Sequence, residues 1–313
     1  MIENNYPALY QAADNASINA QNGYLNNVKA YVVLSVLGAG LSVIGIKSKE
    51  AAILAAMMFL GGLFLSIYIA VKKNEGVWYR ARAVAESIKT LTWRFMMCTE
   101  PFDCASPLHV AKSAFRELLH RILNEHKELA HDLAGSFSLE EQVPEKMIEV
   151  RSKNLEERKA IYLNERIEDQ RKWYANKSAY NKKWGTIWFR ILITLQAIAI
   201  VFTLMRVAYP EFGYWPTEIF VVAGAGVFTW IQLKRFRELA ASYGLAAHEI
   251  GVAMGAIELV QSEEDFSDFV RDTENAFSRE HTQWVAKKGS SSFGVDLMYK
   301  TIKSTPNDEG NHE

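Results

Sequence analysis

The chain has 313 residues, of which 49% are apolar and 23% are charged. Its formal net charge of −1 supplies no overall positive field of the kind that binds nucleic acid, so we expect no nucleic-acid partner. Two cysteines, Cys98 and Cys104, are too few for a disulfide framework, and we expect both to be reduced thiols.

The first two apolar blocks follow a polar opening segment and form a hairpin. They cover about residues 28–46 and 51–71, and a short turn separates them. The second block has 21 residues without a charge. At about 1.5 Å of rise per residue, it is long enough to cross a hydrocarbon core of roughly 30 Å. Gly38 and Gly62 are expected to allow close contact between helices in these spans.

A second hairpin is formed by apolar blocks at about residues 184–206 and 217–233. The third block carries one charge, Arg190, and the turn after it contains prolines, a glycine and aromatic residues that suit a membrane interface. Taken alone, the fourth block fits a buried helix of a soluble protein as well as a span. Four blocks in two hairpins favour spans, and the expected fold is an all-α integral membrane protein.

The charged segments around the hairpins have helical periodicity. We expect long helices to extend from each hairpin into a cytosolic helical region, which covers residues 73–134 after the first hairpin and 234–288 after the second. An apolar stripe marks one helix over residues 109–135. After a connector at 135–149, Pro144 suits a helix start, and helical sequence at 150–183 leads into the third span. Residues 291–313 are expected to form a mostly disordered tail.

Lysines and arginines gather on one side of all four spans, while the two turns hold few. Because positively charged loops stay in the cytosol, both turns are expected outside and both termini in the cytosol. This predicts a multi-pass protein of the inner (plasma) membrane of the cell, whose first partner is the lipid bilayer.

One short motif, Arg-x-Arg-x-x-Ala-x-Ser, occurs where each hairpin ends. It begins at Arg80 with Arg82, and again 155 positions later at Arg235 with Arg237. At the same offset the pair at 125–126 coincides with that at 280–281, which predicts an internal duplication of units 6–134 and 150–290. Contact with lipid headgroups is the favoured role of these arginines, and the alternative is an anionic ligand.

The recurring Glu-His pairs are Glu125 with His126 and Glu280 with His281. A hydrogen bond between helices is favoured for them over a catalytic base. The sequence contains no phosphate-binding loop, no nucleophile elbow, no zinc-protease motif and no Cys-x-x-Cys motif. We therefore expect no enzyme activity, no cofactor and no metal site.

Polar residues within the third span are the candidates for a conduction path. Arg190 and Thr194 share one helical face, and Gln196 and Thr203 share another. Such groups usually face protein or water, so either pore lining or a hydrogen bond to a neighbouring helix explains Gln196. Four packed helices leave no aqueous lumen, so a pore requires several chains.

The hairpins with their flanking helices, "YRARAVAESIKTLTWRFMM" after the second span and "ENAFSREHTQWVAKK" near the end, resemble the SLATT family. These are the SMODS and SLOG associating two-transmembrane effector domains. The resemblance implies two copies in tandem and a role in bacterial conflict systems beside a partner that makes or senses nucleotides.

The same resemblance implies a membrane effector that oligomerises and forms a pore or disrupts the bilayer. The alternative is a membrane-anchored scaffold or sensor, in which the cytosolic helices are the working part.

Overall fold

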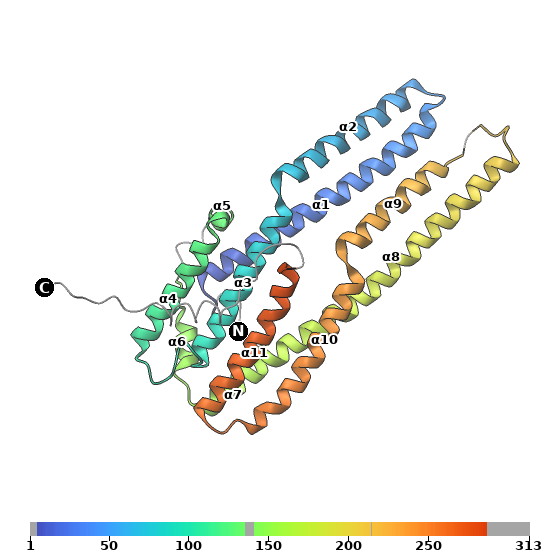
Figure 1. The fold of residues 1–313 in the computed structure, drawn as a ribbon. Coiled ribbons are helices and arrows are strands. Elements are labelled where there is room, and N and C mark those ends of the chain that lie inside the picture. Colours follow the sequence, from blue (N-terminus) through green and yellow to red (C-terminus); the bar gives the residue numbers. More distant parts are fainter. Residues whose placement is uncertain (1–4, 135–140, 214, 287–313) are drawn as a thin grey trace. The chain divides into compact units, whose positions relative to one another are not determined.

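The computed structural model describes residues 5–134, 141–213 and 215–286, with side chains to residue 277 (Figure 1). All regular elements in these ranges are helical, which confirms the all-α class. The predicted tail at 291–313 lies outside the described residues. The helices are α1 (Ala8–Gly45), α2 (Lys49–Lys72), α3 (Asn74–Met96), α4 (Leu108–Glu125), η2 (Lys127–Leu129), α5 (Ala130–Leu133), α6 (Glu145–Arg151), α7 (Leu155–Tyr162), η4 (Leu163–Ile167), α8 (Glu168–Ala208), α9 (Thr217–Lys234), α10 (Phe236–Met254), η5 (Gly255–Leu259) and α11 (Glu263–Ala286).

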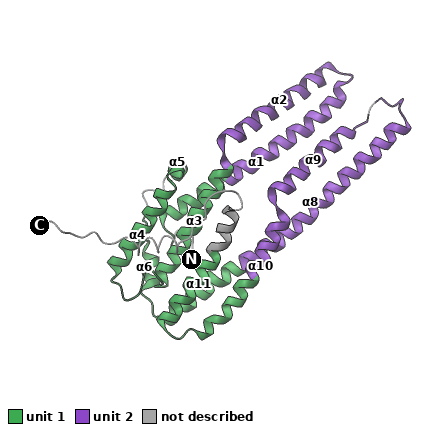
Figure 2. Cartoon of the chain, in the orientation of Figure 1, with its two compact units in different colours: residues 1–20, 75–171, 248–313 green, residues 21–74, 172–247 purple. Residues whose placement is uncertain are grey.

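The chain folds as two compact units that cut across the sequence repeats (Figure 2). One unit contains residues 21–74 and 172–247, which include all four apolar blocks, and is called the membrane unit below. The other contains residues 1–20, 75–171 and 248–313 and is called the extramembrane unit. Each unit therefore draws on both halves of the sequence.

The membrane unit exposes large apolar side chains along its helices. Four helical runs are long and apolar enough to cross a membrane. In α2 only Ala51, Ala55 and Gly62 are buried, while Phe64 is 64% exposed and Val71 75% exposed. Contact between so much apolar surface and water would be unfavourable, whereas contact with the apolar lipid chains is favourable. The chain is therefore a membrane protein with two helical hairpins, as the sequence predicted.

Small residues bring the helices of the membrane unit together, which confirms the role expected of Gly38. A Cβ atom added there would lie 2.7 Å from the ring of Phe59 on α2. Between the hairpins, a Cβ added at Gly226 on α9 would lie 2.5 Å from Val32 on α1. A methyl group at either position would force Phe59 or Val32 to move, so glycine allows the close approach of helices within and between the hairpins.

The second and fourth spans do not continue smoothly into the helices that follow. Lys73 ends α2 with φ 48°, and Arg235 ends α9 with φ 47°, both in the left-handed region. A left-handed residue closes a helix end, so α3 and α10 start as separate helices. Helices extend from the hairpins as expected, with one left-handed residue at each of these two junctions, which propensity and periodicity do not reveal.

The two helix ends also show how the repeats correspond in space. Lys73 and Arg235 occupy the same place in their hairpins and are 162 positions apart. The Arg-x-Arg motif repeats at 155 positions, so it begins inside α3 in the first half but at the end of α9 in the second. The shift arises after the hairpins, because the motif begins seven residues after Lys73 (80 − 73 = 7) but at Arg235 itself.

Aromatic side chains form the core of the extramembrane unit. Trp93, Phe95, Phe102 and Phe115 are fully buried, and the three phenylalanine rings have centroids between 5.3 and 5.7 Å apart. They join α3, the loop after it and α4. The predicted helix start at residue 145 is confirmed, because Pro144 is the residue that precedes α6.

The two cysteines are joined by a disulfide bond, so the expectation of two free thiols was wrong. After α3 ends, the chain folds back on itself, and the amide of Thr99 donates to the carbonyl of Arg94 at 3.0 Å. This loop brings the Cα atoms of Cys98 and Cys104 to 5.0 Å, a separation that a disulfide can span. The sequence separation of six residues gave no indication of the loop.

Candidate functional site

Arg190 lies on the outward face of α8. Its side chain and that of Thr194 are exposed, whereas Leu192 and Ala199 on the opposite side are each 7% exposed and pack into the unit. In the described part of the chain, no carboxylate pairs with Arg190. The chain alone therefore presents a guanidinium group and a hydroxyl group where the bilayer would be.

Gln196 and Thr203 lie on a different side of α8. The hydroxyl of Thr203 donates to the carbonyl oxygen of Ala199 at 2.8 Å, which satisfies it within the helix. The Cγ atom of Gln196 is 3.9 Å from the place of a Cβ at Gly224, which is buried on α9. Gln196 thus borders the contact between α8 and α9, while its side chain remains exposed.

The repeated arginines are partly neutralised by carboxylates. Arg82 pairs with Asp14 at 3.1 Å and with Glu86 at 2.5 Å, and both glutamate and aspartate are largely buried. Arg80 lies 3.7 Å from Glu128. The Asp14 contact joins α1 to α3 across 68 positions, so Arg82 holds the extramembrane unit together.

In the second half, the arginines of the motif belong to the membrane unit. Arg235 pairs with Glu238 in the first turn of α10, and Arg237 is exposed. The two copies of the motif therefore lie in different units and in different local structures.

The first Glu-His pair ends a helix. The helix expected over residues 109–135 stops at Glu125, and His126 is its C-cap, followed by η2 and α5. The His126 ring nitrogen is 3.8 Å from Glu128, and burial lowers the pKa of His126 while that carboxylate acts to raise it. Glu280 and His281 lie within α11, whose side chains are described only to residue 277.

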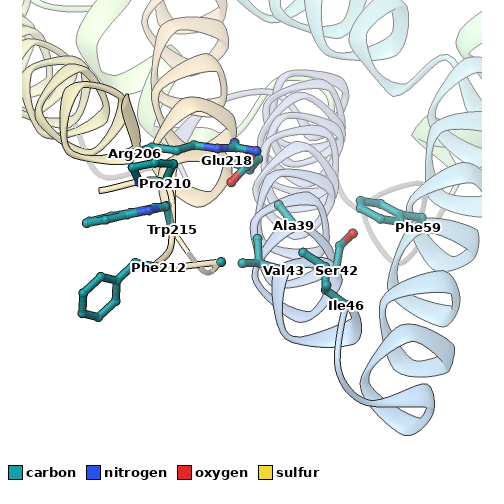
Figure 3. Close-up of a pocket in the computed structure, with 11 residues that line it drawn as sticks. Ala39, Ser42, Val43, Ile46, Phe59, Arg206, Pro210, Phe212, Trp215 and Glu218 are labelled. Atoms are coloured by element: carbon teal, nitrogen blue, oxygen red, sulfur yellow. Dashed lines mark hydrogen bonds and ion pairs between the residues drawn. The ribbon is translucent and has the colours of Figure 1, made fainter. Parts of the chain in front are cut away.

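A pocket of about 460 Å³ opens in the membrane unit near the turn between α8 and α9 (Figure 3). Ala39 and Val43 of α1 form an apolar wall, and Trp215 comes from the turn. Arg206 and Glu218 pair at 3.2 Å and are both exposed. The hollow therefore has a mixed polar and apolar lining, and the ion pair is part of that lining. Across the described residues, no three histidine, cysteine or acidic side chains are placed to hold a metal.

The extramembrane unit contains a fully buried ion pair between Arg166 and Glu274, whose side chains are 2% and 0% exposed. The guanidinium donates to both carboxylate oxygens at 2.8 and 2.7 Å. Thr90 and Tyr162 add hydroxyl donors at 3.0 and 3.1 Å. Burial raises the pKa of Tyr162, and the adjacent carboxylate raises it further. Four hydrogen bonds from three side chains therefore surround one buried glutamate.

Two further arginines in the charged segment before the third span are buried. Arg151 donates to the carbonyl oxygens of Phe95 and Phe102 at 2.8 and 2.7 Å. Arg158 donates to the carbonyl of Met97 at 2.8 Å and pairs with Glu263 at 2.5 Å. The sequence analysis did not single out these arginines. Arg151 ends α6 and Arg158 lies on α7, so their spacing of seven residues does not place them on one helical face and gave no signal.

The buried contacts join the two halves of the sequence. Thr90 and Arg94 of α3 bond to Glu274 and Asn275 of α11, with the Arg94 contact at 2.6 Å. Tyr6, before α1, accepts a hydrogen bond from the indole of Trp93 at 3.1 Å. Helices from both halves thus build one polar core.

Comparison with family models gives two matches that follow each other along the chain. Residues 7–159 match the family described as SMODS and SLOG-associating 2TM effector domain 3, and residues 162–284 match SMODS and SLOG-associating 2TM effector domain 1. Each match contains one apolar hairpin, and the boundary between them falls at the end of α7. The chain matches no curated protein and no solved structure.

Proposed function

The chain belongs to the SMODS and SLOG-associating 2TM effector family and carries two of its domains in tandem, and from this membership we propose a pore-forming effector. Several chains assemble in the bacterial inner membrane, and their membrane units conduct ions or disrupt the bilayer. The extramembrane unit receives the trigger from a partner that makes or senses nucleotides, within a defence system.

The outward face of α8 is the observation that carries this proposal. A guanidinium facing lipid costs about 3 kcal/mol at the middle of a span on insertion scales, and less at Arg190, which is six residues into the third span (190 − 184 = 6). Arg190 avoids that cost when water or another chain covers the face it shares with Thr194. Because four helices enclose no lumen, the water has to lie between chains.

Gln196→Leu separates a conducting role from a packing role. If Gln196 faces the conduction path, leucine removes a polar group from it and lowers single-channel conductance, while assembly is unchanged. If Gln196 supports the contact with Gly224 on α9, the variant loses about 0.6 kcal/mol of packing and conducts normally. Planar-bilayer recordings and crosslinking of the purified full chain measure both. If the proposed function is correct, we expect Gln196→Leu to lower single-channel conductance and to leave assembly unchanged.

Two outcomes bear on the pore as a whole. Channel steps or dye release from vesicles that contain the purified wild-type chain support it. If the chain is toxic when expressed with its cognate system and yet neither steps nor dye release occurs, the pore is refuted.

Topology is tested by labelling single cysteines in a background that carries Cys98→Ser and Cys104→Ser. The concentration of basic residues on one side predicts that both turns face outward. Ser48→Cys and Gly213→Cys are expected to react with an impermeant reagent in intact cells. Ser113→Cys, on the exposed side of α4, is expected to react only after lysis. The reverse pattern would contradict the orientation.

The scaffold or sensor alternative is supported by a different observation. The extramembrane unit has an extensive buried polar core, with Arg166 and Glu274 at its centre, that joins both halves of the chain. A module that only anchors itself in the membrane would work through this unit. The scaffold alternative predicts that signalling is preserved when the spans are replaced by unrelated membrane hairpins. The effector proposal predicts that the same replacement abolishes toxicity.

A further inference from the structure

Three lysines from three helices converge at one end of the membrane unit. Lys29 of α1 and Lys234 at the end of α9 both lie over the ring of Trp230, at 5.5 and 5.8 Å from its centroid. Lys177 of α8 lies over the ring of Trp173 at 5.5 Å. The charges of Lys29 and Lys177 both act on Lys234, so the three ammonium groups repel one another.

No carboxylate offsets this repulsion in the described contacts of the three lysines. The membrane unit has 14 lysines and arginines against 4 glutamates, a net charge of +10, while the whole chain carries −1. Of the four glutamates, Glu50, Glu211 and Glu218 lie at or near the two turns. The fourth, Glu238, is paired with Arg235. The cluster therefore lacks an acidic partner within its own unit.

A fourth donor belongs to the same cluster. The indole Nε1 of Trp230 is buried and has no hydrogen-bond acceptor among the residues that the structure describes. Trp230 also contacts Trp188, with ring centroids 6.3 Å apart, which fixes it between α8 and α9. Buried polar groups without a partner are uncommon, and here the unsatisfied group is a donor beside three cations.

We propose that Lys29, Lys177, Lys234 and Trp230 form a binding site for a phosphate group. Three ammonium groups and an N–H group offer only donors and positive charge, and a phosphate offers several acceptor oxygens and negative charge. The two ring contacts hold Lys29 and Lys234 in place before the ligand arrives. The phosphate belongs either to an anionic lipid headgroup or to a free phosphorylated compound, and this site is independent of whether a pore forms.

The test uses the purified full chain in nanodiscs and two probes. In discs of phosphatidylcholine, inorganic pyrophosphate is titrated by calorimetry. In the second arm, the thermal midpoint is compared between phosphatidylcholine discs and discs that contain phosphatidylglycerol. Pyrophosphate binding identifies a site for free phosphate, and a midpoint raised only by phosphatidylglycerol identifies a lipid site. Either result supports the proposal if it is lost in the variant that replaces the three lysines by glutamine.

The cluster variant carries Lys29→Gln, Lys177→Gln and Lys234→Gln. Near an anionic surface each lysine contributes about a fivefold change in affinity, so the three together are expected to remove the response. The matched control removes the same charge from exposed residues at the same end of the unit: Lys73→Gln, Lys182→Gln and Lys183→Gln.

A second variant with arginine at the three cluster positions keeps the charge, and it is expected to keep binding, which separates ligand loss from misfolding. Equal responses from the cluster variant and the control, or no response from the wild-type chain in either arm, would overturn the proposal.

Discussion

Glu274→Leu is expected to destabilise the extramembrane unit by about 3–5 kcal/mol. The variant leaves the guanidinium of Arg166 charged and buried, and it removes the acceptor of the hydroxyl groups of Thr90 and Tyr162. Burial alone acts to lower the pKa of Arg166, and the Glu274 carboxylate more than compensates, so the native pair stays ionised. Thermal unfolding of the full chain in detergent, with hydrogen exchange on α3 and α11, measures the loss.

Two comparison variants test whether the unpaired buried charge causes the loss of stability in Glu274→Leu. The double variant Arg166→Met with Glu274→Leu removes both charges and is expected to recover most of the stability, because apolar side chains can replace a buried ion pair. Glu117→Leu breaks an exposed pair with Arg121 and is expected to cost less than 1 kcal/mol. A loss below 1 kcal/mol for Glu274→Leu would show that the buried pair does not organise this core.

If the chains assemble into the proposed pore, Arg190→Glu is expected to reverse its ion preference. A ring of arginines favours anions, and the variant converts it into a ring of carboxylates that favours cations. Changing the charge by two in every chain of the ring makes this the largest expected effect on conduction. The sign of the reversal potential in a salt gradient across a planar bilayer measures it.

Arg190→Lys serves as the control because it keeps the charge and should keep the anion preference. Arg190→Gln should leave a pore with weaker preference. If Arg190 reaches the lipid headgroups along the surface of α8 instead, Arg190→Glu would lower the amount of inserted protein and leave the reversal potential of the remaining channels unchanged. That result would remove Arg190 from the conduction path.

The membrane part of the fold could be predicted because it depends on composition. An apolar run of about 20 residues has few alternatives to a span, and the order of the four runs gave both hairpins. Glycine contacts such as Gly38 with Phe59 follow from the same reasoning, since small residues are where membrane helices approach. The motif offset of 155 positions predicted two repeated units, the resemblance identified them as two tandem domains of one family, and the two family matches confirm the tandem arrangement.

The extramembrane unit could not be predicted to the same degree because its decisive contacts are long-range. A run of charge before the third span reads as a solvated helix, yet Arg151, Arg158 and Arg166 are buried in it. Their acceptors are loop carbonyls and glutamates 105 to 108 positions away in Arg158–Glu263 and Arg166–Glu274. Pattern and spacing on one helix contain no information about such partners.

The candidate sites show the same division. Spacing alone placed Arg190 and Thr194 on one face of α8, but only the packing of Leu192 and Ala199 showed that this face points outward. The lysine cluster could not be predicted from the sequence, because Lys29 lies about 150 positions from Lys177 and more than 200 positions from Lys234.

The polar core that α3 and α11 share has a consequence for the evolution of the gene. Thr90 and Arg94 belong to the first SLATT domain and Glu274 and Asn275 to the second, so each domain supplies part of the other's interior. Deleting either domain, or exchanging it for an unrelated one, would leave these groups without their partners. We therefore expect substitutions at the two ends of each bond to be coupled, so that the domains change as complementary partners and not as independent modules.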